Sequence, residues 1–389
     1  MRIALIAIGE ADSADTGPLA GRTLTRHQLD FALAQGCEKV ILFGHGAAPE
    51  AIALRHAAVA GGAQVQVVRG VRDLPATVRG DDALLVLAHG LLPDSPRAFD
   101  LLLEGHCVLV LPAEAGWSAG FERLDLAAAW GGAMVVPGRL VATLDQLPED
   151  AEPIAGLLRV ARQSGVAEIA LPESELAEGR WQIVRSIEAA QAIEPAWLRR
   201  RLSVASPFRP TAWLARMLVQ RFGSRWAGHG RATAALAAGG VALTAGAVAA
   251  AWFGATAAGF ALLVPAAIAI EAGDALGQLG RSIFRPQPIR SRSSLGLRLA
   301  WDVAFVALGV LAIDGSRAHR LFAPLVTAGL LHVPPQWPTT GWRALAADRG
   351  TLAIVMAVAA LADIVEGGLM LLALLLLAVR FAAGAAERS

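Results

Sequence analysis

Lysine and cysteine are both scarce in this sequence. Lys39 is the only lysine, so nearly all of the positive charge is arginine, and the net charge is +1. A nearly neutral chain gives no reason to expect bulk binding of nucleic acid, so no nucleic-acid partner is predicted. The two cysteines, Cys37 and Cys107, have no CxxC partner and no histidine at ligand spacing. We therefore expect neither a disulfide framework nor a zinc site, and both thiols are predicted to lie in the core.

Apolar residues are in excess, but their distribution is uneven. They make up 55% of the 389 residues, which is too many for an ordinary soluble protein. Up to about Arg231 charged and apolar residues mix as in a globular domain, and beyond it Ala, Leu, Val and Gly dominate. The opening MRIALIAIGEADSADTG turns acidic after a short apolar run, so it predicts a first strand and no signal peptide. We expect a cytoplasmic domain over 1–197, a basic segment over 198–231 and a membrane domain over 232–389.

Short strand-like runs alternate with helical patterns in the first part of the chain. The expected strands are Ile3–Ile8, Lys39–Phe43, Gln64–Val68, Ala83–Ala88 and Val108–Pro112, and the expected helices include Leu24–Ala34 and Pro49–Val59. This alternation predicts an α/β, Rossmann-like domain with a mostly parallel sheet and helices on both faces. Ligands of such folds bind beyond the carboxyl ends of the strands, which here include the loop after the first strand.

The order of these segments resembles the sugar-phosphate nucleotidyltransferase fold. The matching pieces are GRTLTRHQLDFALAQGCEKVILFG, DDALLVLAHGLLPD and GRWQIVRSIEAAQAIEPAWL. The resemblance implies a cationic phosphate-binding loop after the first strand and a metal-binding aspartate after a later strand. In this chain the first loop, GEADSADTGPLAG, has no basic residue before Arg22, and the expected aspartate falls on Gly90. Without these groups nucleotidyl transfer lacks its electrostatic stabilisation, so we expect a non-catalytic domain.

A basic stretch precedes the apolar part of the chain. It begins at Arg199 and continues to Arg231, with Trp213, Met217 and Trp226 among the arginines. Arginine favours anionic headgroups and tryptophan favours the membrane interface, so the stretch predicts a helix lying on the inner membrane surface. A plain basic linker is the alternative.

Six apolar segments follow, and they predict an all-α membrane domain of six transmembrane helices. They are Ala232–Phe253, Gly254–Gly273, Leu295–Ile313, Leu321–Val333, Thr351–Val365 and Gly367–Ala386. Four are near the length that crosses a bilayer, and the fourth and fifth are short. If both termini are cytoplasmic, most of the arginines that flank the segments lie on the cytoplasmic side, in agreement with the positive-inside rule. The sequence therefore predicts a multi-pass protein of a bacterial-type inner membrane.

Two acids stand at the end of the second apolar segment. Glu271 and Asp274 are three residues apart, so a helix places both carboxylates on one face. Asp302 lies in the third segment. Carboxylates at membrane depth are energetically costly, so their presence suggests a function. Their hard oxygen atoms would bind Mg²⁺ or Mn²⁺, and the metal would hold a phosphate-bearing substrate. The alternative is that the acids at the helix end only meet water there.

A basic loop connects the second and third apolar segments. It carries Arg281, Arg285, Arg290 and Arg292. A guanidinium group donates two parallel hydrogen bonds to phosphate oxygens, so these arginines are candidates for binding a phosphate or nucleotide. The alternative is that they only satisfy the positive-inside rule and contact lipid headgroups without selectivity.

The whole chain resembles the fused inositol-phosphate cytidylyltransferase and CDP-alcohol phosphotransferase proteins, which make di-myo-inositol-phosphate-phosphate. That family carries D-x-x-D-G-x-x-A-R and then G-x-x-x-D-x-x-x-D, and the resemblance implies two divalent metals and transfer of a CDP-linked group to an alcohol. Here the first two aspartates fall on Glu271 and Asp274, and the last two on Ala300 and Ala304, with Asp302 nearby. Because Asp302 lies about 200° round the helix from position 300, it is expected to face elsewhere.

These patterns lead to three functional hypotheses. The first is a catalytically degraded binding or accessory subunit of phospholipid headgroup metabolism, whose partners are membrane lipids, a CDP-linked or phosphate-bearing ligand, and a second copy or an active paralogue. The second is a working metal-dependent CDP-alcohol phosphotransferase that uses Glu271, Asp274 and Asp302. The third is a transporter-like protein that uses Asp363 and Glu366, three residues apart between the last two segments.

The six-segment topology makes a prediction about accessibility. Cysteines introduced at Ser291 and Ser316, on either side of the third segment, should react with membrane-impermeant maleimide from opposite sides, Ser291 from the cytoplasm. Labelling of both positions from one side would contradict this topology. The wild-type protein in the same vesicles corrects for Cys37 and Cys107.

Overall fold

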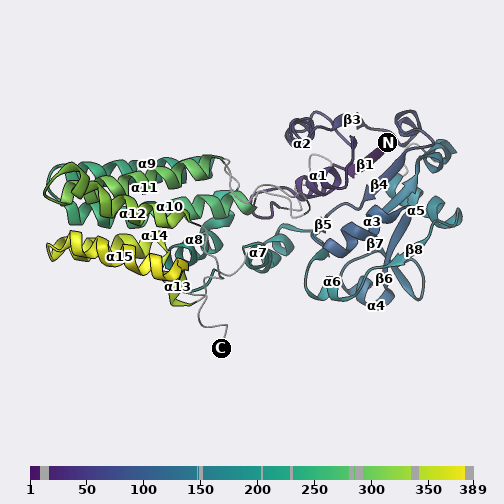
Figure 1. Ribbon diagram of the computed structural model, residues 1–389. Coiled ribbons are helices and arrows are strands. Elements are labelled where there is room, and N and C mark those ends of the chain that lie inside the picture. Colours follow the sequence, from purple (N-terminus) through teal and green to yellow (C-terminus); the bar gives the residue numbers. More distant parts are fainter. Residues whose placement is uncertain are drawn as a thin grey trace. The chain divides into compact units, whose positions relative to one another are not determined.

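The computed structural model forms two compact units (Figure 1). Unit 1 comprises Met1–Trp197 and Arg281–Pro286, and unit 2 comprises Leu198–Gly280 and Gln287–Ser389. The structure describes residues 1–8, 17–146, 148, 152–202, 205–227, 231–279, 284, 292–333 and 341–381. Most of the acidic loop after the first strand lies outside these residues, and its expected inability to bind phosphate stays a prediction.

Unit 1 is built on a seven-stranded, mostly parallel sheet. The strand order is β3-β2-β1-β4-β7-β6-β8, and β7 runs antiparallel to both of its neighbours. The strands are β1 (Arg2–Ala7), β2 (Lys39–Phe43), β3 (Gln64–Val68), β4 (Ala83–Leu87), β6 (Cys107–Pro112), β7 (Ala128–Pro137) and β8 (Glu168–Ala170). The predicted α/β domain is confirmed at this level.

The central strands are buried on both faces. Ile3 and Leu5 of β1 and Leu84 and Val86 of β4 are inaccessible to solvent, and so are the residues between them. Unbroken apolar runs are typical of parallel strands that are covered on both sides. The covering elements include α1 (Leu24–Ala34), α2 (Pro49–Ala60), α3 (Pro96–Glu104), α4 (Ala113–Ser118) and α5 (Pro153–Gln163). Thr23 caps α1 by accepting a hydrogen bond from the backbone amide of Arg26.

Both cysteines lie in this core, as predicted. Cys37 and Cys107 are buried and unpaired. Burial raises the pKa of the Cys37 thiol to about 12, so it stays protonated at neutral pH. Both behave as small apolar side chains.

A second, two-stranded sheet joins β5 (Leu91–Pro93) to β9 (Trp181–Ile183). Trp181 is fully buried, and its indole N–H donates to the carbonyl of Gly131 at 2.6 Å. After β9 the chain continues through α7 (Ile187–Arg201).

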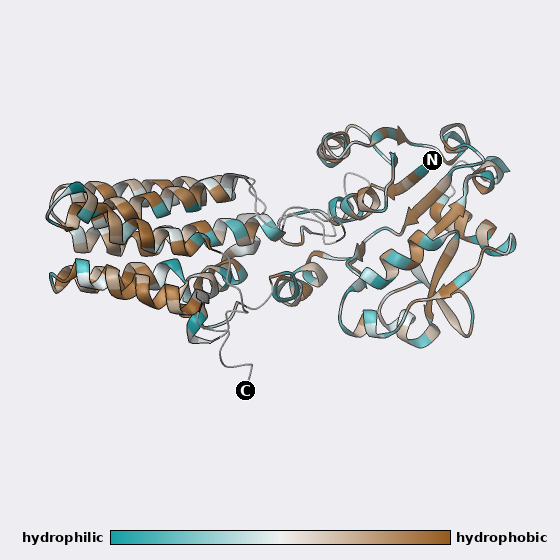
Figure 2. Ribbon diagram, in the orientation of Figure 1, coloured by the Kyte–Doolittle hydropathy of each residue, from teal (hydrophilic) through white to brown (hydrophobic). Residues whose placement is uncertain are grey.

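Unit 2 is entirely helical over its described residues. Its helices are α8 (Pro210–Ala227), α9 (Arg231–Trp252), α10 (Thr256–Leu279), α11 (Arg292–Ala312), α12 (Arg317–His332), α13 (Trp342–Ala346), α14 (Arg349–Leu361) and α15 (Val365–Phe381). Helices α9, α10 and α11 are long and apolar enough to cross a membrane, whereas α14 and α15 are shorter apolar helices. Figure 2 shows the predominance of hydrophobic residues along these helices. A membrane-type helical region is therefore supported, and six crossings remain a prediction.

Several boundaries differ from the sequence-based expectations, and two of the differences affect the candidate site. The second apolar segment was predicted to end at Gly273, but α10 continues to Leu279, so Glu271 and Asp274 lie within the helix. The basic stretch is not one helix: Arg199–Arg201 end α7, and α8 begins separately at Pro210. Proline disfavours helical conformation in the residue before it, which explains a break ahead of Pro210.

Small residues allow α9 and α10 to pack closely. A Cβ atom on Gly259 would lie 2.8 Å from the backbone oxygen of Ala247 and 3.0 Å from Leu308 Cδ2. Trp301 of α11 also contacts α10: it stacks on Phe305, with ring centroids 5.5 Å apart, and donates its indole N–H to the carbonyl of Leu263. Close backbone approach through glycine is typical of membrane helices.

This contact predicts the effect of adding one methyl group. Gly259→Ala should destabilise unit 2 by about 1–3 kcal/mol, because a backbone oxygen cannot move aside as a flexible side chain can. Gly239→Ala on α9 is the matched control, since nothing lies within 4 Å of the added Cβ atom. Apparent Tm in detergent, measured by scanning fluorimetry, should fall for the first variant only. An equal Tm for the two variants would contradict the packing described.

Candidate functional site

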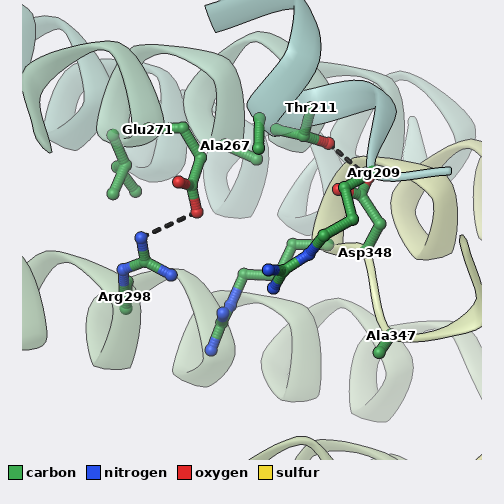
Figure 3. A pocket seen from close by; sticks show the side chains of 10 residues that line it. Arg209, Thr211, Ala267, Glu271, Arg298, Ala347 and Asp348 are labelled. Atoms are coloured by element: carbon green, nitrogen blue, oxygen red, sulfur yellow. Dashed lines mark hydrogen bonds and ion pairs between the residues drawn. The ribbon is translucent and has the colours of Figure 1, made fainter. Parts of the chain in front are cut away.

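A charged cluster joins α10 to α11 inside unit 2. The Nη2 atom of Arg298 lies 2.7 Å from Glu271 Oε1 and 2.8 Å from Asp274 Oδ2. The side chain of Arg298 is 11% exposed, and those of Glu271 and Asp274 are 27% and 20% exposed. Figure 3 shows the Arg298 guanidinium facing Glu271. One guanidinium therefore bridges both carboxylates, in the place where a shared metal ion was predicted.

Helix geometry explains why the two acids meet one arginine. Residues three apart on α10 project from the same face, so both carboxylates point toward the same neighbour. Helix α11 packs against α10 and brings Arg298 to that face. A partly buried carboxylate pair needs a positive partner, and arginine provides a fork of donors that suits it.

Asp302, the third predicted metal ligand, is engaged elsewhere. It is buried, and Arg349 Nε and Nη2 donate to its two oxygens at 2.9 and 2.8 Å. His332 Nε2, at the end of α12, lies 3.0 Å from Asp302 Oδ2. The structure therefore brings Glu271 and Asp274 together and pairs Asp302 with a different arginine. Within the described residues, no group of three His, Cys, Asp or Glu side chains could hold a metal ion.

A third polar contact joins the starts of α8 and α14. Asp348 caps α14 by accepting a hydrogen bond from the Thr351 amide at 3.1 Å. The hydroxyl of Thr211 donates to the same carboxylate and accepts from the amide of Gly350 at 3.1 Å. Both Thr211 and Asp348 are buried. This network fixes the first turn of α8 against the first turn of α14.

These contacts surround a pocket in unit 2. Its wall includes Arg209, Thr211, Glu271, Arg298, Asp348 and Arg349. In Figure 3 the Arg209 side chain points into the space between Arg298 and Asp348. No described carboxylate forms an ion pair with Arg209, which distinguishes it from Arg298 and Arg349.

An adjoining hollow extends the pocket along α10. It is lined by Arg209, Arg216, Asp274, Gln278 and Arg298, among others. Burial lowers the pKa of Arg216, and the nearby charge of Glu271 offsets part of this effect. The guanidinium stays protonated at neutral pH. The two hollows together present several guanidinium groups around one space, which is the arrangement that binds phosphate oxygens in proteins.

The arginines predicted to bind phosphate lie mostly outside the described residues. Arg281, Arg285 and Arg290 are not described, and Arg292 begins α11 without a described side chain. Their role stays a prediction. Arg298 was not among the residues predicted from the sequence, although an arginine inside an otherwise apolar membrane-type segment indicates function or pairing.

The third hypothesis involved Asp363 and Glu366. Asp363 has a φ of 57° in the turn before α15, and Glu366 lies 3.1 Å from His319 Nε2 at the start of α12. Both partners of this contact are exposed. Asp363 thus lies in a turn and Glu366 in the first turn of α15, and a role of these acids in transport stays a prediction.

No family model matches the chain, and the comparison with curated proteins gives no match.

Removal of Arg298 tests the role of the bridge. Arg298→Gln leaves two partly buried carboxylates without their shared cation, so the free energy of unfolding should fall by about 1.5–3 kcal/mol. The control is Arg317→Gln, since Arg317 is an exposed arginine at the start of α12. Thermal unfolding in detergent should show a lower apparent Tm for Arg298→Gln alone. Retention of the wild-type Tm would mean that the bridge does not stabilise unit 2.

Proposed function

We propose that this chain is a multi-pass inner-membrane protein of phospholipid headgroup metabolism that binds a phosphate-bearing ligand without transferring it. Its membrane domain is of the CDP-alcohol phosphotransferase type, with six crossings and a cytoplasmic unit 1. The single observation that carries the proposal is the Arg298 guanidinium bridging Glu271 and Asp274 at 2.7 and 2.8 Å.

A guanidinium and a divalent metal ion differ in coordination chemistry, and this difference favours binding over catalysis at the Arg298 cluster. A divalent metal activates an alcohol because it has open coordination positions and lowers the pKa of a bound hydroxyl. A guanidinium has only N–H donors, so it neutralises the carboxylates but cannot coordinate or deprotonate a nucleophile. The paired Asp302 has both oxygens occupied by Arg349. The cluster is therefore suited to holding charge in place rather than to metal-assisted transfer.

The ligand class follows from the lining of the pocket. Arg209 and Arg216 contribute guanidinium groups, Glu271 and Asp274 already pair with Arg298, and Asp348 already accepts hydrogen bonds from Thr211 and Thr351. A phosphate diester or monoester on a lipid headgroup supplies the matching anionic oxygens. The apolar surface of α9–α11 would accommodate the acyl chains of such a lipid, because these helices have the length and composition of membrane spans.

A working phosphotransferase is the second candidate, and one observation favours it. Glu271 and Asp274 line the hollow beside Gln278 and keep part of their side chains exposed. Displacement of Arg298 by a substrate phosphate would free both carboxylates for Mg²⁺ or Mn²⁺. This alternative predicts metal-dependent release of CMP, which the binding proposal excludes.

Lipid binding and turnover distinguish the two candidates. The full chain in nanodiscs should bind CDP-diacylglycerol or phosphatidic acid, and Arg209→Gln should weaken that binding about tenfold, which is the loss expected for one charge-assisted hydrogen bond. Arg317→Gln is the control and should leave the Kd unchanged. Native mass spectrometry gives the Kd, and phosphatidylcholine is the non-anionic comparison.

The same samples are tested for CMP release from CDP-diacylglycerol with Mn²⁺ and a set of alcohols, including inositol phosphate and glycerol phosphate. No release is expected. Release that disappears in Asp274→Asn would establish the phosphotransferase instead. Equal weak binding of anionic and zwitterionic lipids, unchanged by Arg209→Gln, would refute a selective site.

A further inference from the structure

Helix α8 has an inner face that packs within unit 2. Every fourth residue along this face is buried: Thr211, Ala215, Val219 and Gly223. Residues four apart share one side of a helix, so these small side chains form a single stripe. Helix α8 packs against α10, and a Cβ atom on Gly223 would lie 4.0 Å from Leu279 Cδ1 at the end of α10. The inner face of α8 is therefore occupied by contacts inside unit 2.

The other side of α8 carries large apolar side chains that stay exposed in the part of the chain that the structure describes. Their exposed fractions are 40% for Trp213, 39% for Leu214, 51% for Met217 and 39% for Leu218. These four residues define the outer face of α8. Neighbouring apolar side chains exposed in this way mark a surface that binds another protein or a membrane.

The charges of α8 indicate which of these two covers the outer face. The helix contains Arg216, Arg221 and Arg225 and has no acidic residue. Arg221 is exposed one turn after Met217, on the same side of the helix. Tryptophan and aliphatic side chains combined with arginine are typical of a helix at the surface of an anionic membrane. A second copy of this chain would instead bring like charges together across a symmetric contact.

The place of α8 along α10 agrees with a membrane interface. Ala212 and Arg216 line a hollow together with Glu271, Asp274 and Gln278, which lie in the polar last turns of α10. Helix α10 is long and apolar enough to cross a membrane, so its polar end is expected where the bilayer meets water. Helix α8 packs beside that end, which is the level of the lipid headgroups.

We propose that the outer face of α8 binds the surface of an anionic lipid bilayer. Trp213 and Met217 enter the boundary between headgroups and acyl chains, and Arg221 stays with the lipid phosphates. This assigns to α8 alone the interfacial position predicted for the whole basic stretch. Arg209 and Arg216 line the pocket from the same segment, so the pocket opens at headgroup level. The statement about the pocket rests on the proposed function, and the membrane contact does not.

Spin labelling measures the depth of the outer face. A nitroxide is attached at Met217→Cys, or at Leu214→Cys as a second site, in the full chain in nanodiscs that contain phosphatidylglycerol. Cys37 and Cys107 are buried and should not react. Power-saturation EPR should place both labels about 5–10 Å below the headgroup surface, the depth to which interfacial helices insert. Val241→Cys, near the middle of α9 and 50% exposed, is the reference and should lie deeper.

Three results would contradict the proposal. Labels at both sites that are accessible to an aqueous nickel complex and not to oxygen would show that water covers the outer face. Strong dipolar broadening in the fully labelled protein would show that a second copy covers it. In nanodiscs of phosphatidylcholine alone the labels should move toward water, and an unchanged depth would overturn the contribution of anionic lipid. The depth does not depend on a pocket ligand, so failure of lipid binding in the pocket refutes only the proposed function.

Discussion

The bridge from Arg298 to Glu271 and Asp274 is the interaction on which the arrangement of unit 2 depends. Charges on helices of membrane type are costly unless they are paired, so the two acids on α10 require a cation from a neighbouring helix. Arg298 meets that requirement from α11. The Asp302–Arg349 pair then joins α11 to α14, and Asp348 with Thr211 joins α14 to α8. Polar contacts thus connect four helices around one pocket.

The contacts among these four helices also determine which charges the pocket presents to a ligand. Each carboxylate on its wall has a partner, so the pocket offers a ligand the guanidinium of Arg209 rather than a surplus of acids. That balance favours an anionic ligand over a metal ion.

Much of the fold was predictable from local patterns. Strands β2 and β3 and helix α1 occur at the residues expected. The apolar run of β2 reflects burial on both faces, and the alternation in β3 reflects burial on one face. Each of the six apolar segments overlaps a helix of unit 2, although among the described residues only α9, α10 and α11 have the length and hydropathy of a span. The same-face placement of Glu271 and Asp274 also followed from spacing alone.

The sequence by itself determined which residues are charged within apolar helices and which acids share a face. Only the tertiary structure decided their partners. Asp302 was grouped with Glu271 and Asp274 as a candidate ligand, yet it pairs with Arg349, forty-seven residues away. Phe284 shows the same limit, because a phenylalanine in a basic loop gives no local sign that Phe31 and Phe99 will receive it. Helical periodicity is a short-range property, whereas the choice of partner depends on how distant helices and strands pack.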